Sequence, residues 1–224
     1  MSNYDLSFAI FGGALVFLLI HLKTKEKRDF ILSIFLVTLA VAIATFTTGL
    51  SIQFFFLAAI VLSLIGDLLM AQWISITEHR TIDGVMAFGV AHIIYIIAFS
   101  RLNVGGMELV SVWPLILVSI IVGAGIFLKV GNNEKLHVAL RISNAIYALI
   151  ISILLFFVLV FILTPTTTLL VGLTAGAGIV LFIISDSVLA YNEFQQPIPN
   201  AKEIIAITYI VAQILLQLTP LLTY

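Results

Sequence analysis

The chain has 224 residues, of which 62% are hydrophobic and only 9% are charged, and its formal net charge is -1. A soluble domain carries about 25% charged residues, so this composition excludes a soluble globular protein and also a disordered chain. The absence of cysteine and of a basic tract excludes a disulfide scaffold and a nucleic-acid-binding protein. We therefore expect an all-α, polytopic membrane helix bundle that forms one transmembrane domain over residues 1–224.

Eight apolar stretches are long enough to cross a membrane, which takes about 20 residues. The residues before the first, MSNYD, include an acid and no lysine or arginine, and no small-residue cleavage site follows it, so we expect it to be retained rather than removed as a signal peptide. In chain order the predicted spans are Leu6–Leu22, Phe30–Phe46, Ser51–Ala71, Gly84–Ser100, Ser111–Lys129, Val138–Leu163, Leu169–Ala190 and Glu203–Leu222.

Lysine and arginine are distributed unevenly over the connections between these spans. The single basic residue on one side is Arg101. The other nine fall on the opposite side: Lys23, Lys25, Lys27, Arg28, Arg80, Lys129, Lys135, Arg141 and Lys202. By the positive-inside rule those connections face the cytoplasm and both termini face outward. We expect an integral protein of the bacterial inner membrane.

An internal similarity links the third and seventh spans. The segments AIVLSLIGDLLMA (Ala59–Ala71) and GIVLFIISDSVLA (Gly178–Ala190) align without gaps, and they place Asp67 opposite Asp186. Three helices lie between the third and the seventh span, so both copies would run the same way through the membrane. The pattern favours a parallel 4+4 internal repeat whose axis lies along the membrane normal and brings the two aspartates face to face.

Asp67 and Asp186 are the two acids that lie well inside the spans, and no mid-span lysine or arginine can pair with them. A charge in a span costs about 2.5–3.5 kcal/mol on insertion scales and indicates a functional site. Further polar side chains lie at the same depth, towards the cytoplasmic side, whereas the opposite leaflet is almost free of them. These candidate binding residues are Ser63, His92, Tyr95, Asn144, Tyr147, Ser185, Asn192, Tyr209 and Gln213.

Each of these residues also has a structural interpretation. Serines in spans often bond to their own helix, amides link helices, tyrosines gather at the interface, and a lone histidine can be satisfied in the core. This alternative is weakest for the two aspartates, because asparagine or serine makes a structural polar contact without the risk of a buried charge.

Four blocks occur in the order of a known family: IGDLLM (Ile65–Met70), FGVAHIIYIIAF (Phe88–Phe99), GAGIVLFIISDSVLAYNEF (Gly176–Phe194) and AITYIVAQILL (Ala206–Leu216). Together they resemble the lysoplasmalogenase, or YhhN-type, membrane proteins. The resemblance implies an eight-helix enzyme that hydrolyses the vinyl ether bond of lysoplasmalogens to a fatty aldehyde and a glycerophospho-ethanolamine or glycerophospho-choline. It also implies that the polar positions named above form the site.

Vinyl ether hydrolysis suits a pair of carboxyl groups. Protonation of the alkene carbon gives an oxocarbenium ion that water captures, much as in glycoside hydrolysis with one protonated and one ionised carboxyl. Asp67 and Asp186 are the predicted catalytic residues. We favour Asp67 as the acid, since Gly66 and Leu68 offer it no side-chain donor. Asp186, between two serines, is better placed to stay ionised.

The predicted partners are a lysophospholipid substrate, water and membrane lipid, with no nucleic acid and no cofactor; the oligomeric state stays open. We expect the helix-7 glycines Gly172, Gly176 and Gly178 to leave room for the alkenyl chain. Only His92 of the four histidines lies well inside a span, so no metal site is predicted and an intramembrane zinc hydrolase is disfavoured. A proton-coupled transporter and a non-catalytic lipid-binding protein remain as alternatives.

Overall fold

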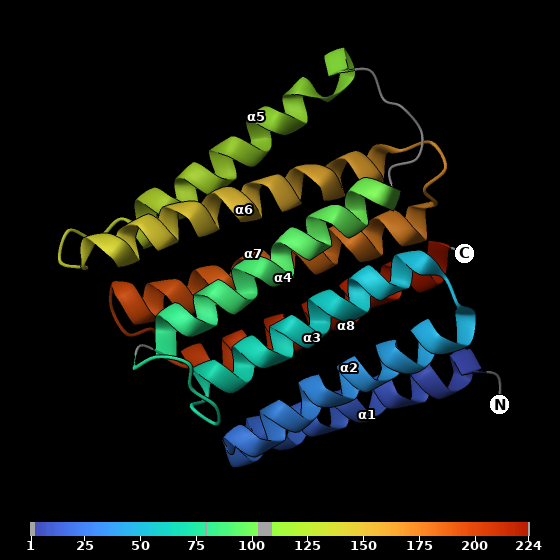
Figure 1. Cartoon of the computed structure of the whole chain (residues 1–224), viewed down its shortest axis with the longest axis horizontal. Helices are drawn as coiled ribbons and strands as arrows, with labels where there is room; N and C mark the ends of the chain where they lie inside the picture. The colour runs from blue at the N-terminus through green and yellow to red at the C-terminus, as the bar shows by residue number, and fades with distance from the viewer. Residues whose placement is uncertain (1–2, 79, 103–108, 224) are drawn as a thin grey trace.

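The computed structural model describes residues 3–78, 80–102 and 109–223, and Figure 1 shows a bundle of long helices. These are α1 (Asn3–Thr24), α2 (Lys27–Thr48), α3 (Ser51–Met70), α4 (Arg80–Leu102), α5 (Leu109–Ile126), a π-helical turn η1 (Phe127–Gly131), α6 (Val138–Leu163), α7 (Leu169–Phe194) and α8 (Ala201–Thr223).

Within the described residues, eight helices are long and apolar enough to cross a membrane. The all-α class and the eight predicted spans are therefore confirmed, and the chain is an integral membrane protein. The helices α4 and α7 extend several residues beyond the predicted spans at the end that carries most basic residues. The reason is that hydropathy marks the apolar part of a helix, while backbone hydrogen bonding continues into the polar interface.

Neighbouring helices pack as antiparallel pairs. The closest pairs are α1 with α2, α3 with α4, and α7 with α8. α8 also contacts α1, α2 and α3, and α6 contacts α4, α5 and α7. In Figure 1 both chain ends lie at one end of the bundle and the α1–α2 connection lies at the other. The four connections that carry the basic residues therefore share one end, which we call the basic end. The predicted internal repeat stays a prediction.

The core of the bundle is aromatic. Phe56 packs edge-on against both Tyr95 and Phe99, and Phe99 packs in the same way against Phe161, with ring centroids 5.4–5.8 Å apart. All four rings are almost fully buried. Large apolar side chains also cover much of the outer surface of the bundle, as a lipid-facing surface requires.

α5 is the most peripheral helix. Only 17% of the apolar stretch of α5 is buried inside the protein, whereas 56% of the corresponding stretch of α8 is buried. Its packing partner is α6, and the two approach closely at Gly123, where an added Cβ would lie 1.6 Å from Oγ of Ser152. The π-helical turn η1 follows α5 directly and widens the backbone at the basic end.

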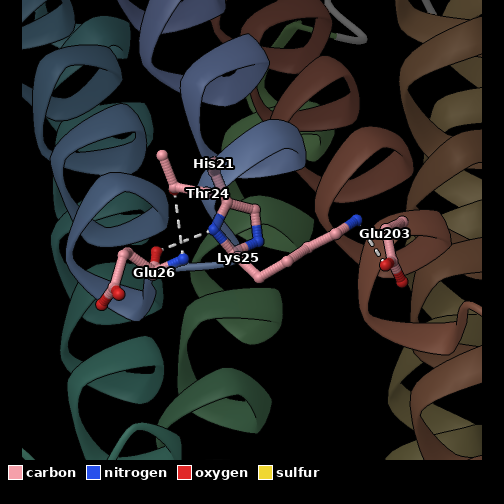
Figure 2. A network of polar contacts seen from close by, with 5 residues as sticks. All are labelled: His21, Thr24, Lys25, Glu26 and Glu203. Atoms are coloured by element: carbon pink, nitrogen blue, oxygen red, sulfur yellow. Dashed lines mark hydrogen bonds and ion pairs between the residues drawn. The ribbon is translucent and has the colours of Figure 1, made fainter.

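Polar side chains organise the connections at the basic end. Lys25, which has a left-handed φ of 60°, closes the α1–α2 turn and reaches Glu203 of α8 across 2.5 Å (Figure 2). Within the same turn, Nδ1 of His21 donates to the backbone carbonyl of Glu26 at 2.8 Å. This turn therefore ties the first helical pair to the start of the last helix.

Two further acids are buried in the first turns of helices, where sequence reasoning did not single them out. Asp29 accepts a hydrogen bond from the Thr24 hydroxyl at 2.6 Å, and Asp83 accepts from the backbone N–H and the hydroxyl of Thr77, both at 2.8 Å. Both therefore anchor connections, and the partial positive charge of a helix N-terminus favours them there.

Candidate functional site

Asp186 lies on α7 and is held by groups from two other helices. The phenol of Tyr147 on α6 donates a hydrogen bond to Oδ2 of Asp186 at 2.6 Å. Nε2 of His92 on α4 lies 3.9 Å from the same oxygen. The Asp186 side chain keeps 14% of its surface exposed, so this carboxyl is fixed by a donor and is still reachable from outside the protein.

Asp67 lies on α3 and has a similar partner. The phenol of Tyr209 on α8 donates to Oδ2 of Asp67 at 2.8 Å. Asp67 is buried and retains 7% exposure. Its partner Tyr209 packs against Phe182, which lies on α7 as Asp186 does. Two helices that are far apart in sequence thus bring both acids to the same region of the bundle, each with one tyrosine.

Aromatic rings fill the space between the two acids. The His92 ring packs edge-on against Phe182 and Tyr147, with centroids 4.7 Å and 5.3 Å away. Phe182 in turn packs against Tyr209 at 5.7 Å, and Phe88 packs against the same Tyr209 at 6.1 Å. The two carboxyl–tyrosine pairs therefore belong to one packed cluster rather than to separate sites.

The orientation of His92 follows from its backbone contact. Nδ1 of His92 lies 2.5 Å from the carbonyl oxygen of Phe88, one turn earlier on α4. A carbonyl can only accept, so Nδ1 carries the hydrogen, and Nε2 of a neutral ring is then an acceptor. No hydrogen-bond donor reaches Nε2 among the described residues. The acceptor nitrogen of His92 thus lies near Asp186, 3.9 Å from Oδ2 and beyond hydrogen-bond distance.

Two adjoining pockets open beside Asp186 at the basic end. The first encloses about 450 Å³ of empty space, open mouth included, between α3, α4, α6 and α7. The second encloses about 350 Å³ between α6, α7 and the α5–η1 segment. Asn144, Tyr147, Asp186 and Ala190 line both pockets, so the Asp186–Tyr147 pair stands in their common wall.

Asp67 lines neither of these pockets. The Phe88 ring lines the first pocket and lies against Gly66, the residue before Asp67. A Cβ added at Gly66 would lie 3.0 Å from that ring, so the absence of a side chain there lets Phe88 pack onto α3. Phe88 therefore contacts both the pocket and the residue before Asp67, and Asp186 is the acid that lines the pocket.

The remaining predicted binding residues divide into two groups. Ser185 donates to the backbone carbonyl of Ile205 on α8 at 3.4 Å, and Oδ1 of Asn192 accepts from the backbone N–H of Ile198 at 3.1 Å. These two contacts join α7 to α8 and order the connection between them. The hydroxyl of Ser185 is therefore directed at α8 and not at Asp186.

Tyr95 and Gln213 belong to a second polar network, farther from the basic end than the acids. The Tyr95 phenol donates to Oε1 of Gln213 at 2.8 Å and accepts from Nε2 of Gln217 at 2.5 Å. Ser63, one turn from Asp67, is fully buried. Its hydroxyl has no hydrogen-bond partner in the part of the chain that the structure describes.

The expected scarcity of polar groups in the half of the bundle away from the basic end is wrong. Gln53 and Gln217, both at most 2% exposed, line a small recess there together with Phe56. The Thr48 hydroxyl at the end of α2 donates to Oε1 of Gln53 at 2.7 Å. Gln53 and Gln217 lie near span ends, where interfacial or helix-linking side chains are usual. A single sequence does not show whether such side chains point into the bundle or out of it.

The expected role of the helix-7 glycines is also wrong. A Cβ on Gly178 would lie 3.0 Å from the side chain and 3.2 Å from the backbone nitrogen of Leu216 on α8. Gly172 and Gly176 face Ile162 of α6 in the same way, at 3.5 Å and 3.2 Å. These glycines allow helices to approach each other closely, as small residues do in membrane proteins, and leave no space for a lipid chain.

Sequence reasoning did not assign several residues of the site. Phe182 packs directly on His92, and the η1 residues Phe127 and Val130 line the second pocket. π-Helical turns occur often at functional sites, yet an apolar sequence gives no signal for one. Glu193 and Phe194 line the first pocket because α7 continues past the predicted span end.

Comparison of the sequence with known proteins assigns the chain to a family. A sequence profile of the YhhN family matches residues 28–219. The chain is 32% identical over 163 residues to human lysoplasmalogenase TMEM86B, covering 73% of this chain and 62% of that protein. It is 29% identical over 165 residues to the pig protein of the same name, covering 72% and 61%. The matched part thus spans less than two thirds of these relatives, and no solved structure matches. The profile nevertheless covers most of the chain, which therefore belongs to the YhhN family.

Proposed function

We propose that this protein is a membrane lysoplasmalogenase, which cleaves the vinyl ether bond of an alkenyl glycerophospho-ethanolamine or glycerophospho-choline. One observation carries this proposal: Asp186 and Tyr147 stand in the common wall of two pockets at the basic end, with a second buried acid nearby. The relatives named lysoplasmalogenase support it.

The depth of the site fits such a substrate. A lysolipid places its headgroup at the interface and its vinyl ether just beneath. Asp186 lies about two turns from the end of α7, which puts its carboxyl at that level. We further propose that the basic end faces the cytoplasm, as the distribution of lysine and arginine predicts, so that the substrate enters from the cytoplasmic leaflet.

In the proposed reaction, Asp186 is the acid. Its carboxyl proton is delivered to the alkene carbon that is not bonded to oxygen, which leaves an oxocarbenium ion at the neighbouring carbon. Asp67 in its ionised form stabilises this cation and takes a proton from the water that attacks it. As the hemiacetal collapses to a fatty aldehyde, Asp67 returns its proton to the departing glyceryl oxygen and the hemiacetal hydroxyl passes its proton to Asp186, which restores both carboxyl groups.

This assignment reverses the preference that the sequence suggested. The preference relied on Ser185 and Ser187 as donors that keep Asp186 ionised, but Ser185 donates to Ile205 instead. Asp186 lines the pocket, whereas Asp67 does not, and the Phe88 ring packs on Gly66 beside Asp67. Both carboxyl groups can reach the vinyl ether bond of one substrate molecule only after Phe88 rotates away from Gly66. Substrate entry is therefore expected to displace the Phe88 ring.

Incubation of the purified protein with a lysoplasmalogen, and separately with the saturated lysolipid of the same headgroup, tests the proposal. Free aldehyde should form only from the vinyl ether lipid. Asp67→Asn and Asp186→Asn should each abolish release while the protein still inserts and unfolds at a similar temperature. Binding of both lipids without aldehyde would instead favour a non-catalytic lipid-binding protein.

The polar network around Tyr95, Gln213 and Gln217 favours one alternative, a proton-coupled transporter, because it extends polar groups away from the basic end. Proteoliposomes separate the two functions. A transporter acidifies the vesicle lumen when a pH gradient or a lysolipid is applied and releases no aldehyde, whereas the proposed hydrolase releases aldehyde with no proton flux.

A further inference from the structure

A file of polar side chains runs through the interior from Asp67 towards the end of the bundle that carries the chain termini. Tyr209 bonds to Asp67, and Gln213 follows Tyr209 one turn later on α8. Gln213 accepts from Tyr95, which in turn accepts from Gln217. Gln217 and Gln53 then line the same recess. We call this series, with Ser63, the polar file.

The polar file contains four side-chain atoms with no hydrogen-bond partner in the described ranges 3–78, 80–102 and 109–223. They are Ser63 Oγ, Gln213 Nε2, Gln217 Oε1 and Gln53 Nε2, and their residues are at most 2% exposed. Leaving a buried polar atom unpaired costs about 1–3 kcal/mol. More than about 90% of buried polar groups in proteins are paired with protein or ordered water, so four together in one membrane bundle require a small polar ligand.

Water is the ligand that this set of atoms fits. The four atoms comprise two amide donors, one carbonyl acceptor and one hydroxyl that can do both. A buried water makes about three hydrogen bonds to such a mixture of donors and acceptors, whereas an anion needs donors alone and a metal ion needs acceptors alone. The apolar ring of Phe56, which packs against Tyr95, excludes larger polar molecules from this part of the polar file.

The pocket and the polar file approach the acids from opposite sides. Asp186 lines the pocket, whereas Asp67 does not line it and bonds to Tyr209 at the start of the polar file. A lipid that fills the pocket covers Asp186 and blocks water from that side. The polar file then offers a separate route to Asp67.

We propose that the polar file is a track of bound water, and that it supplies the water consumed in hydrolysis to Asp67 from the side opposite the lipid. Its role in catalysis rests on the proposed lysoplasmalogenase function, whereas the presence of water in the track does not. In the reaction, a water oxygen bonds to the oxocarbenium carbon, one of its protons passes to the Asp67 carboxylate, and the next water moves along the polar file.

Hydroxyl-radical labelling of the protein in lipid nanodiscs tests the track directly. Radicals formed from bound water modify adjacent rings, so Tyr95 should be labelled about fivefold faster than Phe99 once each rate is divided by the intrinsic reactivity of its ring. Both rings lie on α4 and both are 0% exposed, which makes Phe99 a matched control. Equal labelling of Tyr95 and Phe99 in the unaltered protein would overturn the proposal without the need for a variant.

Variants then connect the track to catalysis. Gln213→Leu keeps the side-chain volume and removes the amide, so Tyr95 labelling should fall to the level of Phe99, and kcat for aldehyde release should fall about tenfold at unchanged KM. The control is Ser119→Ala on α5, which removes a buried unpaired hydroxyl outside the polar file and should change neither measurement.

The outcomes distinguish the two proposals. Labelled Tyr95 without aldehyde release from any lysoplasmalogen would refute the lysoplasmalogenase function and leave the water track supported. Aldehyde release with Tyr95 no more labelled than Phe99 would refute the track and leave the function supported. If Gln213→Leu abolishes labelling and leaves kcat unchanged, the track does not supply the reacting water.

Discussion

Tyr147→Phe removes one oxygen atom from the candidate site and leaves the ring that packs against His92. The phenol donates to Asp186 across 2.6 Å, in a partly buried position where water replaces it poorly. In the proposed reaction Asp186 becomes charged as it gives up its proton, and a hydrogen bond to a charged group contributes about 1.5–3 kcal/mol. Because about 1.4 kcal/mol corresponds to a factor of ten, kcat/KM for aldehyde release should fall about 10–150-fold.

The control is Tyr191→Phe. Tyr191 is also on α7, but its phenol accepts from the exposed amide of Gln196 at 2.7 Å and contacts neither acid. Aldehyde release from the two variants should be measured in nanodiscs beside their thermal unfolding. We expect Tyr191→Phe to match the unaltered protein. If Tyr147→Phe retained its rate within about twofold while still folding, Asp186 would not depend on this bond and the proposed acid would be wrong.

Three further outcomes are expected. Gly123→Ala should lower the free energy of unfolding by about 1–3 kcal/mol, because the added Cβ would overlap Ser152. Ser152→Ala in the same chain should restore part of this loss. If the effects of the two substitutions simply added, the close approach of α5 and α6 at Gly123 would be contradicted. Lys25→Gln should lower the melting temperature only slightly, since the pair with Glu203 is solvent-exposed, and the difference should vanish in high salt, as melting curves at two salt concentrations can check. EDTA should leave aldehyde release unchanged, because no three metal-binding side chains gather in the described part of the chain. If EDTA abolished aldehyde release and added zinc restored it, this prediction would be refuted.

The fold could be predicted because a membrane imposes a simple rule on sequence. A helix must be apolar for about 20 residues, and eight stretches satisfy this without ambiguity. The depth of a residue could be predicted for the same reason, since it follows from counting 1.5 Å per residue from the span end. Asp67 and Asp186 therefore fell at one level before any contact was known.

The direction of a side chain around its helix could not be predicted in the same way. Ser185 and Asn192 lie near Asp186 in sequence, yet one bonds to α8 and the other to the α7–α8 connection. An almost uniformly apolar helix has no polar face that would indicate its orientation. Tyr147 and Tyr209 were among the candidates by depth, but their pairing with particular acids depends on which helices are neighbours.

The recess at Gln53 and Gln217 was missed for a related reason. Both residues lie near span ends, where amides usually meet the headgroup region, and one sequence does not show that they point inward. The prediction that the α7 glycines leave room for a lipid chain failed for a different reason. A missing side chain can either create space or allow a neighbouring helix to come into contact. Only the position of Leu216 decides between these outcomes for Gly178.

The peripheral position of α5 divides the chain into parts with different tolerance to mutation. A helix that touches lipid around most of its circumference has to satisfy the hydrocarbon and little else, so exchanges among leucine, isoleucine and valine there should be almost silent. α8 contacts protein on most sides, and the same exchanges would alter its fit against several neighbours at once. Random mutagenesis should therefore accumulate substitutions in the fifth helix while leaving the eighth nearly unchanged.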